Sequence, residues 1–101
     1  MSEVDALEIV EKRLLGQNSI LVKIKMGYGF DKNEYDELVV SIKILTNIYR
    51  EAILVPKRLA LAFVDISNYF YINEGLYSDE DLNKMEDAVH EIVELANVLF
   101  E

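Results

Sequence analysis

The stretch from Ser78 to Leu99 reads SDEDLNKMEDAVHEIVELANVL. Ser78 and Asp81 have the spacing of a capping box, and Tyr77 is placed to pack on Leu82 across the first helical turn. Apolar residues then recur at intervals of three and four, at Leu82, Met85, Val89, Ile92, Ala96 and Leu99. Because these intervals match a period of 3.6 residues per turn, the stretch predicts an amphipathic helix with one buried face.

The N-terminal segment shows the same kind of pattern. A helix is expected to begin at Ser2, which has Asp5 at the capping-box spacing, and to stop at Gly16. Its apolar stripe consists of Val4, Leu7, Val10 and Leu14. The short segment 19–26, SILVKIKM, fits either a helix or a strand. The helix is favoured because the sequence contains no second strand that would pair with it.

The longest apolar stripe begins after Asp31. Glu34 follows Asp31 at the capping-box spacing, and Phe30 is placed to pack against Tyr35. The stripe continues through Tyr35, Leu38, Val39, Ile42, Leu45, Tyr49, Ala52 and Ile53, and is widened by Val40, Ile44 and Ile48. This width predicts a central helix that is covered on more than one side.

A further helix is expected to start at the only proline. Pro56 suits a first helical turn, where its missing N–H costs nothing. The helix is apolar almost all round, with Leu59, Ala60, Leu61, Ala62, Phe63, Val64 and Ile66, and Asn73 and Gly75 are expected to stop it.

Together these segments predict an all-α fold, a compact antiparallel bundle of four main helices plus one short helical segment. The 101 residues suffice for one hydrophobic core, so residues 1–101 are expected to form a single helical domain. No run of about 18 apolar residues is present, and the acidic, amphipathic N-terminus differs from a signal peptide. The chain has no cysteine for disulfides or cysteine zinc sites. We therefore expect a cytoplasmic protein that does not enter a membrane.

The negative charge is concentrated near the C-terminus. The net charge of the chain is −9, and residues 74–101 contribute nine acids against one base, Lys84. Such a field repels phosphate backbones and attracts cationic surfaces. Direct binding of nucleic acid is therefore disfavoured, and a basic protein partner is favoured.

Metal and enzyme sites are the less favoured interpretations of the acids. His90 has Asp87 and Glu94 within one helical turn, but di-iron bundles need two such motifs and two more inward carboxylates. Glu34 with Glu37, and Glu91 with Glu94, have the E-x-x-E spacing that all-helical nucleotide pyrophosphohydrolases use to hold magnesium. A capped first turn and a solvated helix face explain these acids as well. We expect no metal, no cofactor and no catalytic residue.

Aromatic residues next to the acids indicate a binding surface. Tyr69, Phe70 and Tyr71 are consecutive, so they point about 100° apart on a helix and do not all enter one core. Tyrosines beside carboxylates have the composition of a hot spot for a cationic partner. Asp65, on the most apolar helix, either makes an internal polar contact or binds a basic residue of the partner.

The segment FVDISNYFYINEGLYSDEDL, residues 63–82, followed by an acidic amphipathic helix, resembles small bacterial immunity proteins of the colicin-immunity type. These proteins bind and neutralise a basic toxin domain through acids and tyrosines. The resemblance implies that the interface includes Asp65, Tyr69, Tyr71, Tyr77, Asp79, Glu80 and Asp81.

The sequence therefore predicts a non-enzymatic domain that masks a basic surface of a toxin or nucleic-acid-binding protein, as an immunity protein, antitoxin or phage-type inhibitor does. Glu86, Asp87 and Glu94 extend the expected interface. A second version of this hypothesis is mimicry of nucleic acid, in which a ridge of carboxylates imitates a phosphate track, formed by Asp79, Glu86 or Asp87, Glu94 and Glu101. The alternatives are a homo-oligomeric structural or regulatory protein, such as a homodimer that covers the apolar helix after Pro56, and a pyrophosphohydrolase-like enzyme.

Overall fold

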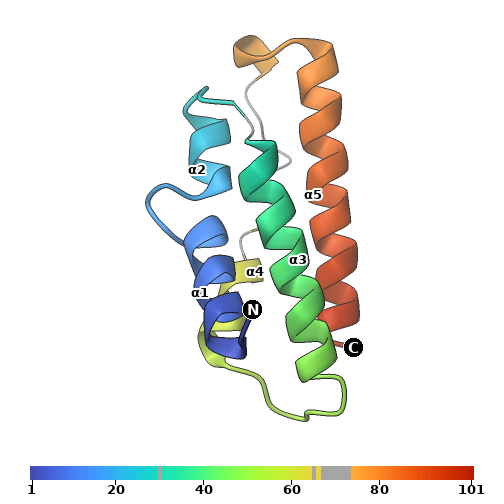
Figure 1. The fold of residues 1–101 in the computed structure, drawn as a ribbon. Coiled ribbons are helices and arrows are strands. Elements are labelled where there is room, and N and C mark those ends of the chain that lie inside the picture. Colours follow the sequence, from blue (N-terminus) through green and yellow to red (C-terminus); the bar gives the residue numbers. More distant parts are fainter. Residues whose placement is uncertain (30, 65, 67–73) are drawn as a thin grey trace.

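The computed structural model describes residues 1–29, 31–64, 66 and 74–101, which form five α-helices and no strand (Figure 1). The helices are α1 (Glu3–Leu14), α2 (Ile20–Lys25), α3 (Lys32–Ile48), α4 (Lys57–Val64) and α5 (Asp79–Leu99), and a 3-10 turn, η2 (Glu74–Leu76), precedes α5. The predicted all-α class is confirmed, with four longer helices and the short α2. Segment 19–26 is thus helical.

The helices form an elongated bundle of 43 × 22 × 20 Å. α3 packs against both α1 and α5, and α4 packs against α1. Figure 1 shows that α1 and α3 run in opposite directions, whereas α3 and α5 both run from the upper to the lower end. α3 and α5 share a direction because the chain returns to the upper end before α5 begins.

Side-chain caps start four of the helices at the predicted places. Ser2, Ser19 and Ser78 accept hydrogen bonds from the backbone N–H groups three residues ahead. Asp31 accepts from the N–H groups of Asn33 and Glu34. Each cap satisfies N–H groups that have no partner within the helix, which stabilises a helix start by about 1 kcal/mol.

The core is built from buried residues of all five helices. The predicted α5 stripe is buried from Met85 to Leu99, with Leu82 half-buried. Opposite it, α3 contributes Leu38, Ile42 and Leu45, all fully buried. Each such side chain contributes roughly 1.5–3 kcal/mol through burial of apolar surface. At the lower end, Phe63 of α4 meets Phe100 edge to face, with the ring centres 5.5 Å apart.

The predicted stripe of α1 is partly wrong. Val10 and Leu14 are buried as expected, but Val4 is 62% exposed, and Ala6 takes its place in the core. The reason lies in Arg13, which is on the same helical row as Ala6 and Val10 and pairs with carboxylates of α3. These ion pairs are made only when that row faces α3.

The predicted length of the central helix is also wrong at its end. α3 ends at Ile48, so Ala52 and Ile53 lie in the following loop and are exposed. Figure 1 shows that the lower end of α3 already extends beyond the last turn of α5. Pro56 also disfavours a helical conformation at Val55.

α4 is described as far as Val64, and the later part of the predicted helix lies mostly in 65 and 67–73, outside the described residues. Leu59, Ala62 and Phe63 are buried, whereas Leu61 and Val64 are exposed. The predicted contact of Phe30 with Tyr35 also involves a residue outside the described part.

Candidate partner-binding site

The outer side of α5 carries the predicted carboxylates. The exposed acids of its first turn and of the side away from its buried stripe define the α5 acidic face: Asp79, Glu80, Asp81, Glu86, Asp87, Glu91 and Glu94. From Asp79 to Glu94 these charges are spread over roughly 22 Å of helix. Among the described residues of α5, Lys84 forms an ion pair with Glu80 at 3.4 Å. Most of the negative charge of this face therefore meets solvent.

The acids of the α5 acidic face differ in their effect on the stability of the helix. Asp79, Glu80 and Asp81 occupy the first turn, where the partial positive charge of a helix N-terminus stabilises carboxylates. Glu86, Asp87 and Glu94 lie further along the helix, beyond the reach of this effect. Neither the helix N-terminus nor the ion pair of Lys84 accounts for their charges.

Glu91 has a structural role. The hydroxyl of the buried Tyr35, on α3, donates a hydrogen bond to the Glu91 carboxylate and lies 3.4 Å from the carbonyl oxygen of Ala88. Burial raises the pKa of Tyr35 above its ordinary value, and the hydrogen bond to Glu91 raises it further. This contact ties α5 to α3.

Tyr77 binds within the protein through its hydroxyl. The hydroxyl donates to the carbonyl oxygen of Ile24 at 2.7 Å and accepts from the N–H of Gly29 at 3.1 Å. Gly29 has φ of +89°, a conformation that glycine adopts without strain. The turn between α2 and α3 is thus joined to the start of α5, and the Tyr77 ring is held in a defined place.

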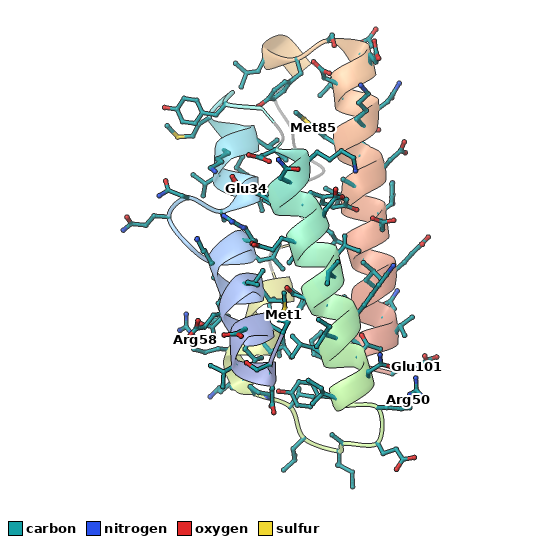
Figure 2. The ribbon with its side chains drawn as sticks, in the orientation of Figure 1. Met1, Glu34, Arg50, Arg58, Met85 and Glu101 are labelled. Atoms are coloured by element: carbon teal, nitrogen blue, oxygen red, sulfur yellow. The ribbon has the colours of Figure 1, made fainter. Side chains whose placement is uncertain are left out.

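A pocket of about 520 Å³ lies beside this ring and is named here the Tyr77 pocket. The described residues that line it are Gly29, Lys32, Tyr77, Asp81, Lys84 and Met85. Met85 is buried and, in Figure 2, lies near the upper end of α5. The pocket therefore joins apolar walls to the first carboxylates of the α5 acidic face.

An ionic cluster at the junction of α1, α2 and α3 was not predicted. Arg13 pairs with Glu34 at 3.0 Å and with Glu37 at 3.1 Å, and Lys23 also pairs with Glu34. Figure 2 places Glu34 between α2 and α3. The Glu34 carboxylate therefore binds cations of two other helices instead of completing a capping box with Asp31. No local pattern identifies Arg13 as their partner, because it lies 21 and 24 residues away in the chain.

The two E-x-x-E pairs do not converge. Glu34 and Glu37 face Arg13 of α1, whereas Glu91 faces Tyr35 on another side of α3. In the described part of the chain no group of three or more histidine and carboxylate side chains is placed to hold a metal ion, and Asp87, His90 and Glu94 form no such group.

Three predicted interface residues, Asp65, Tyr69 and Tyr71, lie outside the described residues. The seven others are brought together along α5 and at its start. Among the described helices none is both long and apolar enough to cross a membrane. Comparison of the chain with protein-family models, with curated proteins and with solved structures finds no match.

Proposed function

We propose that this protein binds and masks a basic surface of a partner protein, as an immunity protein, antitoxin or phage-type inhibitor does. The observation that carries the proposal is the α5 acidic face, and within it Glu86, Asp87 and Glu94. These exposed carboxylates neither cap the helix nor pair with the one lysine of α5. Complementary charge of this kind speeds association and selects cationic partners.

The distribution of the carboxylates along α5 indicates the class of partner. Carboxylates spread over roughly 22 Å along one helix imitate part of a phosphate track, so a toxin or another protein that binds nucleic acid fits best. Nucleic acid itself carries the same sign of charge as this face and is repelled by it.

The test uses the product of the gene adjacent to that of this protein. Its affinity is measured by calorimetry at several salt concentrations for the wild type and for a variant with Glu86→Gln, Asp87→Asn and Glu94→Gln. The control variant carries Asp5→Asn, Glu8→Gln and Glu51→Gln, which also removes three exposed negative charges, from α1 and from the loop after α3.

We expect the α5 variant to bind about tenfold more weakly and with a smaller salt dependence, because each charge at an interface rim contributes about 0.5 kcal/mol. The control variant should bind like the wild type. Equal affinity of the two variants would show that α5 does not provide the interface.

Self-association is the second candidate, because the loop after α3 exposes two large aliphatic side chains. Ile53 is 97% and Leu54 84% exposed, and Leu61 and Val64 of the adjacent α4 are exposed as well. Apolar surface of this kind marks interaction sites.

Light scattering distinguishes self-association from binding of a basic partner alone. A dimer that is lost in an Ile53→Ser, Leu54→Ser variant would establish self-association, and a monomeric wild type at about 100 μM, a concentration far above typical specific dissociation constants, would exclude it.

A further inference from the structure

Two of the described residues that line the Tyr77 pocket, Tyr77 and Met85, are already held in place. The Tyr77 hydroxyl is bonded to the backbone of Ile24 and Gly29, which keeps the ring from turning into the pocket or away from it. Met85 is anchored in the core by the buried face of α5. A pocket with fixed walls binds a ligand without the entropic cost of ordering those walls.

The lysines that line the pocket have neutralised charges. The Lys32 ammonium group lies 3.0 Å from Asp36, and the Lys84 ammonium group lies 3.4 Å from Glu80. Each of these pairs joins residues one helical turn apart, so the lysine stem contributes apolar surface to the pocket while its charge is matched.

Asp81 gives the pocket its electrostatic character. It lines the pocket, is exposed, and is not a member of any ion pair between described residues. Asp79 lies in the same helical turn and adds negative charge nearby. An apolar pocket with an unmatched carboxylate at its rim fits a side chain that has an apolar stem and a cationic end.

We propose that the Tyr77 pocket receives an arginine side chain of the basic partner, with the arginine stem between Tyr77 and Met85 and the guanidinium group on the Asp81 carboxylate. This inference rests on the proposed function and names the anchor residue of that interface. Arginine fits better than lysine because its planar group stacks on an aromatic ring and binds a carboxylate through two parallel hydrogen bonds.

The experiment is a titration of the ¹⁵N-labelled protein with the peptide acetyl-Lys-Gly-Arg-Gly-Lys-amide. Three matched peptides carry citrulline, norleucine or glutamate in place of the central arginine. Citrulline has nearly the shape of arginine without its charge, and norleucine keeps only an apolar stem. All four peptides are used first with the unaltered protein, so the comparison does not depend on a variant that must fold.

The arginine peptide should bind at least about fivefold more tightly than the citrulline peptide, because a charge-assisted hydrogen bond is lost with citrulline. The amide signals that move should belong to Gly29, Tyr77, Asp81, Lys84 and Met85. In an Asp81→Asn variant the difference between the two peptides should fall below about twofold. A Glu51→Gln variant, which removes an exposed charge from the loop after α3, should keep it.

Equal binding of the arginine and citrulline peptides, or shifts confined to residues 86–94, would overturn the pocket inference. The proposed function would stand in that case, because it is tested separately with the folded partner and the Glu86, Asp87 and Glu94 variant. Tighter binding of the glutamate peptide would also overturn the inference, since it would identify the pocket as a site for anions formed by Lys32 and Lys84.

Discussion

Two pairs of glutamates with identical spacing have opposite surroundings in this molecule. Glu34 and Glu37, on α3, are held by Arg13, and the Glu34 side chain is only 13% exposed. Glu91 and Glu94, on α5, are exposed, and Glu91 accepts a hydrogen bond from the Tyr35 hydroxyl. The comparison teaches that carboxylates of the first pair hold helices together, whereas those of the α5 acidic face mostly remain available to another molecule.

The largest expected loss of stability comes from replacing Arg13, the cation that binds Glu34 and Glu37. An Arg13→Met variant leaves Glu37 without its cation and the largely buried Glu34 with Lys23 alone, so it should lower the free energy of unfolding by about 2 kcal/mol. Urea unfolding measures this change. A variant that also carries Glu34→Gln and Glu37→Gln should recover much of the loss, because the buried charge is then absent. A loss below about 0.5 kcal/mol in the single variant would mean that the cluster is not structural.

A smaller effect is expected where α5 meets α3. A Tyr35→Phe variant removes the hydroxyl that binds Glu91 but keeps the buried ring, so unfolding should become easier by about 1 kcal/mol. Thermal or urea unfolding gives this value. Its control is Tyr28→Phe, which removes a hydroxyl from an exposed ring. If both variants unfold alike, the Tyr35–Glu91 contact does not stabilise the helix pair.

Tyr49 makes a similar hydrogen bond from its hydroxyl to a carboxylate, at a more exposed position. Its hydroxyl binds Glu3, and burial followed by this hydrogen bond raises the pKa of Tyr49 from 10.0 to about 12. A tyrosine with a raised pKa is harder to ionise in the folded chain than in the unfolded one. Its contribution to stability is therefore complete below pH 10 and is lost as the pH rises toward 12.

A Tyr49→Phe variant should make the melting temperature decline less steeply between pH 9 and about pH 11.5 than that of the wild type. A melting temperature with the same slope in both proteins would show that Tyr49 does not couple ionisation to folding.

The smallest effect on stability is expected on the α5 acidic face. The Glu86→Gln, Asp87→Asn, Glu94→Gln variant should unfold within about 0.5 kcal/mol of the wild type, because these exposed groups hold no neighbouring helix. Urea unfolding tests this directly. A marked loss of stability would give these carboxylates a role in the fold and weaken their assignment to a partner.

The helix starts and the buried face of α5 could be predicted because both depend on residues within a few turns of one another. Ser2, Asp31 and Ser78 all cap the helices they were expected to start. The end of α3 could not be predicted in this way. The apolar periodicity continues to Ile53, but the described neighbouring helices provide no surface that would bury the residues after Ile48. The internal hydrogen bonds of the Tyr77 hydroxyl, to Ile24 and Gly29, could not be predicted either, because these residues lie 53 and 48 positions away in the chain.

The sequence by itself determined the all-α class, the helix starts and the concentration of negative charge on the last helix, because caps, periodicity and charge are local properties. The tertiary structure decided which charges are used internally. Arg13 reaches Glu34 and Glu37 only when α1 lies along α3, and Tyr77 reaches Ile24 and Gly29 only when α5 begins beside α2. These contacts join residues more than 20 positions apart, and their energies depend on burial that no local pattern records.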